Sequence, residues 1–440
     1  MENKYKGKIS IVTVNYNGKE YLKPLLDSLK LQTYPNFEII FVDNASTDDS
    51  VNFVKKNYPA VKIVRKKKNL GFAGGNNSAL PYCTGEYVAL INNDMVANKD
   101  WLRNLHKSLQ DNNADVIGPK ILFYKPFITL NLNIKTFVPS DNGLGKDRRE
   151  LGCMVGSDLF FDNVNYKKTL FLENTFNEEN DGAYKFHWVS DKAIIKAPID
   201  LKLVSYKLKI KLAVSDFQKK ERVKIFIGKE IIFDKIIDNK TREYIINIDR
   251  KVIHKHYRYV INNASSAFSL QTGFGKDIGM YEDDEGQYDI SKKAFSLCGG
   301  SMLIKKDVIN KLGLFDEYFF AYYEDTDFCW RLKNKNKKLF YEPSAVVYHI
   351  HTGTSKEWSP FFIYHVERNR LAMLLKNAKA KNIFKELMNF FFQISKDFLV
   401  IIKSENSKES IERIRVKAYV NLLLNLPVLL YERWKINFKN

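Results

Sequence analysis

The first part of the chain alternates between short apolar runs rich in β-branched residues and stretches with helical spacing. Four runs have the length and composition of buried strands: Ile9–Val14, Phe37–Val42, Val61–Val64 and Tyr87–Ile91. Between the first two runs, leucines recur at the spacing of one helical face: Leu22, Leu25, Leu26 and Leu29. Strands separated by helices predict an α/β fold with a mostly parallel, Rossmann-like sheet. Ligands bind at the carboxyl ends of the strands in such sheets, so the polar residues there are the candidates for function.

The pattern changes twice further along the chain. From Ala193 to Ile248, short lysine-rich runs alternate apolar and polar residues, among them Leu201–Val204, Tyr206–Ile210 and Val223–Ile227, which predicts an inserted antiparallel β-sandwich. After about residue 357 the spacing is helical, with a stripe of Ile383, Leu387, Phe390, Ile394, Phe398 and Ile401 beside several lysines. We therefore expect two halves of one α/β domain at 1–140 and 259–356, a sandwich at 150–258 and amphipathic helices at 357–440.

Composition limits the partners and the setting of the protein. Lys plus Arg number 70 and Asp plus Glu 51, so the net charge is +19 and an anionic partner is expected: phosphate groups, a lipid surface or nucleic acid. No helix-turn-helix, zinc-finger or aromatic RNA-binding pattern supports nucleic acid. Four scattered cysteines exclude a disulfide scaffold and favour a reducing cytosol. We expect neither a signal peptide nor a membrane span, because no apolar stretch is long enough.

Three early segments place polar residues directly after predicted strands. Asp43-Asn44 offers a carboxylate and an amide that can bond the edge of a base, although such residues also favour helix caps and turns. The glycine-rich stretch 69–77 lets backbone approach a ligand closely, or is only a tight turn. Asn92-Asn93-Asp94 offers oxygen ligands for a hard divalent ion, or caps a loop.

Two late segments also carry candidate chemistry. Three carboxylates stand within four positions at Glu324, Asp325 and Asp327, and repulsion between acids raises a pKa, which suits a proton acceptor. Acids also stabilise a helix N-terminus, and both explanations can hold together. His349 and His351 follow an apolar strand at Ala345–Tyr348 and are candidate metal ligands, although a lone histidine is usually structural.

These segments, in this order, resemble family 2 glycosyltransferases with the GT-A fold, and most closely the bacterial rhamnosyltransferase-like members that build cell-surface polysaccharides. The resemblance rests on IVTVNYNG (11–18), FVDNASTDDS (41–50), NLGFAGGNN (69–77), INND (91–94), INNASSAF (261–268), DIGMYEDDEGQYD (277–289), CGGSMLIKKDVINKLGLFDEYFFAYYEDTDFCWRL (298–332) and HIHTGTS (349–355). It implies inverting transfer of a sugar from a nucleotide-diphosphate donor to a hydroxyl of a glycan or lipid-linked glycan acceptor.

The same resemblance assigns roles to residues. Asp325 matches the catalytic base and Glu324 its neighbouring acid. Asp94, His349 and, as a substitute, His351 match ligands of a divalent cation, Mn or Mg. Gly299, Gly300 and Trp330 fall on the acceptor side. The nucleotide-sugar positions are Val14, Asn15, Tyr16, Asn17, Asp43, Asn44, Asn69, Gly71, Asn92 and Asn93. Asn92 and Asn93 stand where many relatives carry acids, so the resemblance implies a weaker metal site.

Several alternatives stay open on the sequence. The C-terminal helices either contact a membrane, which places the protein peripherally on the cytoplasmic face of the plasma membrane, or cover the sheet, or form a homodimer. The inserted sandwich binds carbohydrate or a partner, or serves as a spacer. A non-catalytic glycan-binding protein on a GT-A scaffold is the main alternative function. A sugar nucleotidyltransferase fits the late acidic and histidine motifs poorly.

Overall fold

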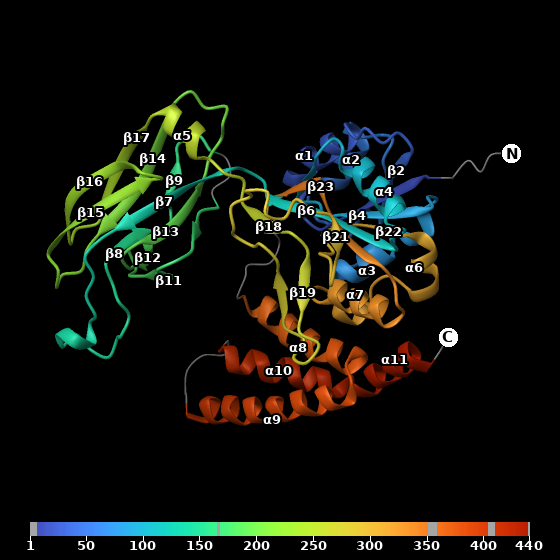
Figure 1. Cartoon of the computed structure of the whole chain (residues 1–440). Helices are drawn as coiled ribbons and strands as arrows, with labels where there is room; N and C mark the ends of the chain where they lie inside the picture. The colour runs from blue at the N-terminus through green and yellow to red at the C-terminus, as the bar shows by residue number, and fades with distance from the viewer. Residues whose placement is uncertain (1–6, 165–167, 351–358, 404–409, 439–440) are drawn as a thin grey trace. The chain divides into compact units, whose positions relative to one another are not determined.

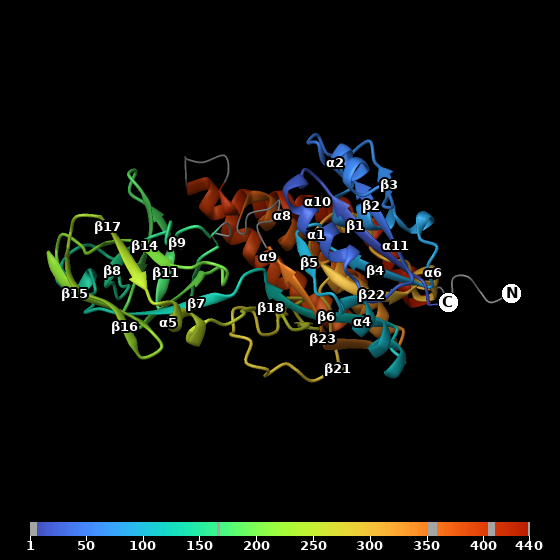
Figure 2. The same cartoon turned by 90° about the horizontal axis from the view of Figure 1, so that it is seen from above.

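The chain forms two compact units, one inserted into the other. The computed structural model describes residues 7–164, 168–350, 359–403 and 410–438. The first unit comprises Met1–Tyr124, Ile261–Glu282 and Gly286–Asn440, and the second comprises Lys125–Val260 and Asp283–Glu285. The elements of each unit can be followed in Figures 1 and 2.

The first unit is built on a mixed sheet with strand order β21-β23-β6-β22-β4-β1-β2-β3, to which β5 and β18 add at β23 and β6. The four N-terminal strands are parallel to one another, whereas β22 runs antiparallel to both β4 and β6, and β23 runs parallel to β6. All four predicted strands are confirmed. The strands are β1 (Ile9–Asn15), β2 (Phe37–Asp43), β3 (Lys62–Arg65), β4 (Tyr87–Ile91), β5 (Met95–Ala97), β6 (Val116–Phe123), β18 (Ile261–Asn263), β21 (Lys292–Lys293), β22 (Ser301–Lys305) and β23 (Leu339–His349).

Helices cover both faces of this sheet because its central strands are apolar on both sides. In β1, Ile9 and Ile11 pack into one core with α1, α2 and α4, while Val12 packs into a second core with α3, α6 and α7. The predicted leucine face of α1 is buried. The helices are α1 (Lys19–Lys30), α2 (Ser50–Asn57), α3 (Gly71–Asn77), α4 (Trp101–Asp111), α6 (Lys306–Leu312) and α7 (Glu324–Asn334), with short turns η1 (Leu80–Tyr82) and η3 (Glu317–Phe319).

The inserted unit consists of two antiparallel sheets, as the lysine-rich alternation predicts. Along β14, Leu208 and Ile210 are buried and Lys207 is exposed. The predicted strand at Leu201–Val204 is wrong: this segment is a turn, in which Asp200 accepts a bond from the backbone N–H of Lys202. The elements are β7 (Phe127–Asn133), η2 (Ser140–Asn142), β8 (Cys153–Gly156), β9 (Phe160–Phe161), β10 (Leu170–Phe171), β11 (Thr175–Asn180), β12 (Lys185–Val189), β13 (Ala193–Pro198), β14 (Tyr206–Ala213), β15 (Lys220–Ile227), β16 (Glu230–Asp238), β17 (Arg242–Ile248) and α5 (Arg250–His256).

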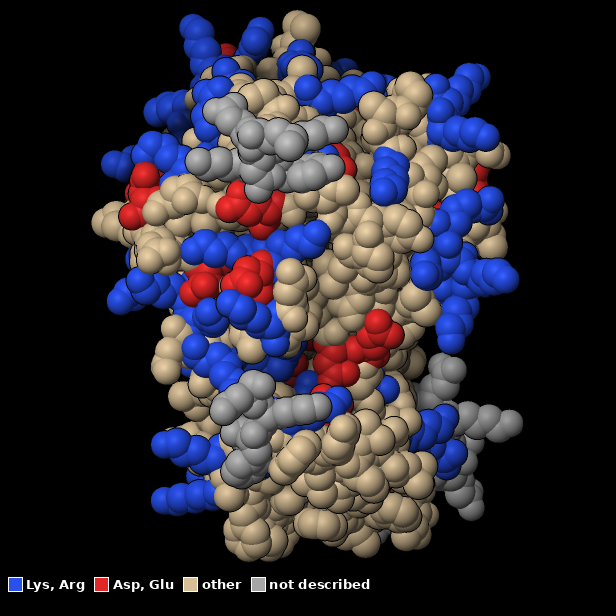
Figure 3. Space-filling view, turned by 90° about the vertical axis from the view of Figure 1, so that its right-hand side faces the viewer, with Lys and Arg blue, Asp and Glu red and all other residues tan. Residues whose placement is uncertain are grey.

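Four C-terminal helices form a layer on the first unit: α8 (Pro360–Asn377), α9 (Ala380–Lys403), α10 (Ile411–Leu424) and α11 (Leu426–Phe438). Their apolar residues share a core with Phe319, Trp330 and Phe268, the last on the hairpin of β19 (Ser266–Phe268) and β20 (Gly275–Asp277). In Figure 3 the lower end of the molecule, where α9 lies in Figure 1, carries few charged side chains. Among the described residues no single helix meets the length and hydropathy of a membrane span, although Ile411–Leu424 and Leu426–Ile436, bent by 60°, meet them jointly.

Candidate active site

Asp325 stands in the first turn of α7, where its carboxylate is held by three donors. Oδ2 accepts a bond from the backbone N–H of Gly299 at 2.8 Å, and Oδ1 accepts from the backbone and hydroxyl of Thr326 at 2.6 and 3.1 Å. A Cβ on Gly299 would lie 2.9 Å from the Cβ of Asp325, so only glycine permits this approach. The carboxylate therefore has a fixed orientation, as a proton acceptor requires.

Burial raises the pKa of both neighbouring acids, Asp325 and Glu324. Burial raises the pKa of Asp325 above its ordinary value, and the charge of Asp277 raises it further, although the bonds from Gly299 and Thr326 oppose this rise. The pKa of Glu324 is raised well above its ordinary value, first by burial and then by the charge of Asp325. Its Oε2 atom is buried without a hydrogen-bond partner. Burial thus favours the neutral form of Glu324, whereas the bonds from Gly299 and Thr326 stabilise the carboxylate of Asp325.

Asp94 and His349 form a second group at the ends of β4 and β23. The Nε2 atom of His349 lies 3.3 Å from Oδ2 of Asp94, and its Nδ1 atom lies 3.1 Å from Oδ1 of Asn262. Two ligands at right angles, each about 2.1 Å from a divalent ion, are about 3.0 Å apart, so this pair fits a shared cation. Asn262 orients the imidazole, as groups behind metal-binding histidines do.

The described residues supply only part of a coordination shell here. Within the described ranges no cluster of three or more His, Cys, Asp or Glu residues is suited to hold a metal ion. Asn92 and Asn93 add no charge, and the predicted substitute His351 lies outside the described residues. A cation bound by Asp94 and His349 would need further oxygen ligands, which the phosphates of a nucleotide can provide.

The pairing of β4 with β22 brings these two groups together. Gly299, whose N–H binds Asp325, is followed by Gly300, whose carbonyl accepts a bond from Asn92 N at 2.9 Å. Asp94 follows two positions later. This series of contacts places Asp325 at the same end of the sheet as Asp94 and His349, although the three residues are far apart in sequence. A Cβ on Gly300 would come within 2.7 Å of the terminal methyl of Met95, so a larger residue at the second predicted acceptor-side glycine would displace that side chain.

Asparagine side chains near the ends of β1 and β2 form a hydrogen-bond network beside this group of residues. Asn15 is fully buried and accepts a bond at 2.8 Å from the amide of Asn93. Its own amide donates to the hydroxyls of Ser46 and Ser50 at 3.2 and 3.0 Å. Asn17, in a left-handed conformation with φ of 51°, accepts a bond from the backbone N–H of Thr47 at 2.7 Å. The tip of β1 is thus locked onto the start of α2.

Asn44 links the tip of β2 to the glycine-rich segment. Its amide donates to Oδ1 of Asn69 and to the carbonyl of Gly71, both at 2.9 Å, and its oxygen accepts from the backbone N–H of Leu70. Asp43 is buried and accepts from the backbone N–H of Ser46 at 3.2 Å. These bonds bring the predicted donor-side segments together at the carboxyl ends of β1, β2 and β4.

Three further predicted residues lie in different surroundings. The side chain of Val14 faces Gly75 of α3, where a Cβ would come within 2.6 Å of it. Tyr16 is exposed. Trp330 is 4 % exposed and packs against Phe268 with ring centroids 4.9 Å apart, so its side chain belongs to the helical core and not to the edge that carries Asp325.

The structure adds two residues to which the sequence assigned no role. Asn262, in the motif at 261–268, orients His349. Asp277, at the end of the β19–β20 hairpin, accepts a bond at 2.6 Å from Asn263 and raises the pKa of Asp325 through its charge. Both lie within motifs that the resemblance already included, and only their position in space distinguishes them from neighbouring polar residues.

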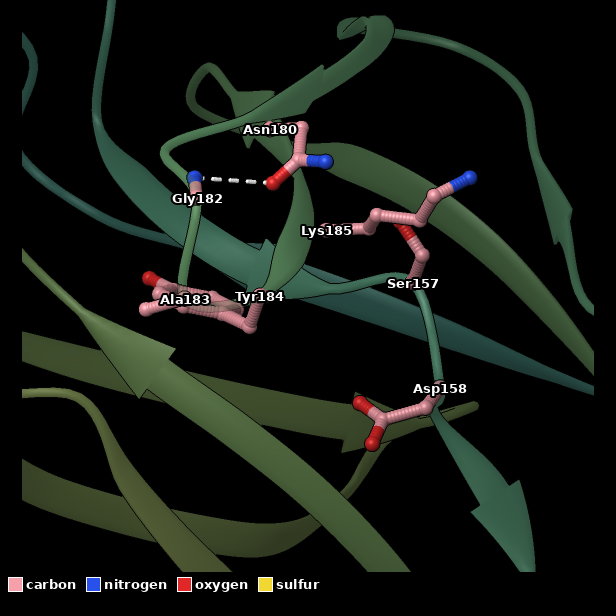
Figure 4. Close-up of a pocket in the computed structure, with 7 residues that line it drawn as sticks. All are labelled: Ser157, Asp158, Asn180, Gly182, Ala183, Tyr184 and Lys185. Carbon is pink, nitrogen blue, oxygen red and sulfur yellow. Dashed lines mark hydrogen bonds between the residues drawn. The ribbon is translucent and has the colours of Figure 1, made fainter.

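A hollow on the inserted unit carries no comparable chemistry (Figure 4). It is lined by the turn between β11 and β12, where Oδ1 of Asn180 accepts a bond from the N–H of Gly182 at 2.9 Å, and by Ser157 and Asp158. The charges at its rim are neutralised by neighbours, because Asp158 pairs with Lys211 and Lys185 pairs with Glu178. We assign no catalytic role to this hollow.

Comparison with known proteins supports the interpretation of the first unit. Residues 10–166 match the model described as Glycosyl transferase family 2. The N-terminal segment therefore resembles a family 2 glycosyltransferase domain. Together with the Rossmann-like sheet, this match confirms the predicted GT-A-type α/β fold with added antiparallel sheets and C-terminal helices.

Curated relatives cover only part of this chain. A 115-residue segment is 32 % identical to the poly(ribitol-phosphate) beta-N-acetylglucosaminyltransferase TarS of Staphylococcus aureus, over 25 % of this chain and 20 % of TarS. A 120-residue segment is 34 % identical to a poly(ribitol-phosphate) beta-glucosyltransferase of Bacillus spizizenii, over 26 % of this chain and 19 % of the relative. The solved structure of S. aureus TarS 1–349 covers 97 % of this chain and 82 % of its own at 16 % identity, with a TM-score of 0.39, a likeness too slight to support a conclusion.

Proposed function

We propose that the chain is an inverting glycosyltransferase. It moves a sugar from a nucleoside-diphosphate donor to a hydroxyl of a glycan or lipid-linked glycan in cell-surface polysaccharide synthesis. The observation that carries this proposal is that Asp325, half-buried and held by three donors, lies at the same end of the sheet as the Asp94–His349 pair. The names of the two relatives, both sugar transferases acting on poly(ribitol phosphate), support a polymeric acceptor of the cell envelope.

The proposed reaction is a single displacement. The acceptor oxygen bonds to the anomeric carbon, the bond from that carbon to the diphosphate oxygen breaks, and the hydroxyl proton passes to Asp325. Gly299 and Thr326 keep the carboxylate of Asp325 in a fixed orientation. A divalent cation held by Asp94 and His349 would stabilise the charge that develops on the diphosphate. The amide network around Asn15 and Asn44 would hold the nucleotide.

The variant Asp325→Asn tests this function. It keeps the shape of the side chain but removes the proton acceptor, so we expect transfer to fall by about 10²–10⁴-fold. Binding of the donor nucleotide, measured by calorimetry, should stay unchanged because Asn15, Asp43 and Asn44 are intact.

The matched control is Asp307→Asn, which alters an exposed acid paired only with Lys311. Transfer would be measured by mass spectrometry with a panel of nucleotide sugars and teichoic-acid-like acceptors. Full activity of Asp325→Asn would remove this residue from the reaction. Glycan binding by a wild-type protein that neither hydrolyses nor transfers any donor would favour the non-catalytic alternative.

We further propose that the enzyme acts peripherally at the cytoplasmic face of the plasma membrane, and that α9 makes the contact. Helix α9 is apolar on two faces. Most of the face predicted from the sequence packs inward, with Phe390 buried and Ile383, Leu387 and Ile394 against the helical core. Phe398, which was predicted on the same face, is exposed instead. A second stripe points outward and comprises Phe384, Met388, Phe391, Phe392, Phe398, Leu399 and Ile402.

The charged residues of α9 also differ between its inward and outward faces. Its two acids point inward, where Glu386 pairs with Arg370 at 3.0 Å and Asp397 pairs with Arg415 at 3.2 Å. The described charges left on its surface are the lysines 381, 385 and 396. An apolar stripe flanked only by cations matches an anionic lipid surface.

A further inference from the structure

The loop that leads into the catalytic helix has an unusual backbone. Between η3 and α7, three aromatic residues within four positions have positive φ: Phe320 at 61°, Tyr322 at 68° and Tyr323 at 70°. Bulky side chains rarely adopt such φ values, so the backbone of this loop is strained. Tyr323 directly precedes Glu324 and Asp325. The conformation that places the catalytic base therefore needs support from outside the loop.

That support comes from α8, in the C-terminal helical layer. Asn369 is fully buried, and its amide nitrogen lies 2.8 Å from each of three loop carbonyls, those of Phe319, Ala321 and Tyr322. Arg368 donates from Nη2 to the carbonyl of Tyr318 at 2.9 Å. These contacts supply donors to the carbonyls of Ala321 and Tyr322 and add to the bond that the carbonyl of Phe319 accepts from the backbone N–H of Ala321 at 2.7 Å.

Arg368 also fixes the orientation of the Asn369 amide. Its Nε donates to Oδ1 of Asn369 at 2.8 Å, so the oxygen faces the guanidinium and the nitrogen faces the loop. Arg368 in turn lies over the rings of Tyr318 and Tyr364, at 4.7 and 5.4 Å from their centroids. The two residues form one rigid donor unit, which we call the α8 clamp.

On its other side, the loop holds the donor-side segment. The carbonyl of Phe320 accepts bonds from the backbone N–H groups of Phe72 and Ala73 at 2.7 and 3.1 Å. Gly71 approaches so closely that a Cβ would lie 2.4 Å from the same carbonyl oxygen. Asn44 then binds Gly71. One hydrogen-bonded path thus runs from α8 through the strained loop to the end of β2, with Asp325 branching from it.

We propose that Asn369, oriented by Arg368, is a positioning residue that holds Asp325 in register with the donor-side segment. The inference rests on the proposed transferase function. It makes α8 a part of the catalytic apparatus, and it assigns a role in the reaction to a helix that the sequence presents only as a covering or membrane-binding element. Asn369 acts through the loop carbonyls and does not itself contact the reacting atoms.

The variant Asn369→Ala tests this role. Without the amide, the loop relaxes, and a displacement of about 1 Å at a catalytic group can cost about 10²-fold in rate. We expect kcat to fall by about that factor while the KM for the donor changes only a few-fold, because Asn15 and Asp43 keep their own bonds. Hydrogen–deuterium exchange of the amides at 318–323 should become faster in the same variant.

The matched control is Asn377→Ala, another buried asparagine on α8, whose amide donates to Asp327 and not to the loop. Its thermal midpoint should fall by a similar amount, but kcat should stay within a few-fold of the wild type. If Asn369→Ala does not yield folded protein, Arg368→Lys is the second variant. It keeps the positive charge but loses the planar guanidinium group, so we again expect a lower kcat with an unchanged KM for the donor.

The outcomes separate this inference from the proposed function. Unchanged hydrogen–deuterium exchange at 318–323 in Asn369→Ala would contradict the proposed role of the α8 clamp. The same conclusion would follow if kcat fell in both asparagine variants in proportion to the fall in their thermal midpoints. A wild-type protein that transfers no sugar would defeat the proposed function and with it the catalytic role of Asn369. Wild-type transfer combined with full kcat in Asn369→Ala would defeat the positioning role alone.

Discussion

At the scale of single residues, the site depends on a few close approaches that leave no space for substitution. Gly299 brings backbone to Asp325, and Asn262 fixes one nitrogen of His349 so that the other faces Asp94. The sequence could indicate Asp325 and Asp94, because each follows a recognisable local pattern. It could not indicate Asn262 or Asn369, because an asparagine that bonds a distant group has the same local context as one that caps a turn.

The variant Asp94→Asn tests the cation site at this scale. The change removes the one carboxylate of the pair, so we expect the affinity for Mn²⁺ in the presence of a nucleoside diphosphate to fall by more than about tenfold. Calorimetric titration of the metal measures this directly.

The variant Asn262→Ala removes only the group that orients the imidazole. It should lower the affinity for Mn²⁺ by about 10–100-fold if His349 is a ligand.

Asp111→Asn serves as the control, since Asp111 is an exposed acid paired only with Lys107 on α4. Its metal affinity should equal that of the wild type. Retention of Mn²⁺ affinity in Asp94→Asn would show that this carboxylate holds no ion.

At the scale of elements, the early strands and α1 were predictable because burial on both faces leaves a local signature of β-branched residues and a leucine stripe. The antiparallel insertion of β22 beside β4 was not predictable, because it depends on contacts between segments more than two hundred residues apart. Helix α9 is a third case. The sequence predicted an apolar stripe, most of which packs inward, but the second, outward stripe became distinct only when the structure showed which face is covered.

The double variant Phe391→Ser with Phe392→Ser tests the outward face of α9. These rings are 55 % and 65 % exposed, so their loss should leave the fold intact. A fully buried Phe contributes about 1.5–3 kcal/mol, so binding to vesicles should weaken by about tenfold or more. Co-sedimentation of the full chain with phosphatidylcholine vesicles, with and without phosphatidylglycerol, measures the effect.

The control replaces two equally exposed residues of the inserted unit, Ile236→Ser with Ile245→Ser, and should bind as the wild type does. Equal binding by both variants would argue against a lipid contact at α9. If the phenylalanine variant instead converted a dimer to a monomer in sedimentation, the face would be a contact between two copies of the chain.

At the scale of the whole molecule, the inserted unit leaves and re-enters the first unit at adjacent strands. Ile261 of β18 pairs with Leu122 of β6 in antiparallel register. A variant in which a short Asn-Gly turn replaces residues 125–260 should therefore keep the sheet and still bind the donor nucleotide.

Removal of residues 360–438 should instead unfold the protein, because it uncovers Phe319 and Trp330. Circular dichroism and calorimetry check both results, and loss of folding in the first variant would show that the two units depend on each other.

This adjacency also has an evolutionary consequence. A module that occupies the position of a hairpin turn can be gained, exchanged or lost without changing the register of β6 or β18. Lineages that share this scaffold are therefore free to carry different accessory modules at this point, and recombination here alters what the protein can associate with while the first unit stays unchanged.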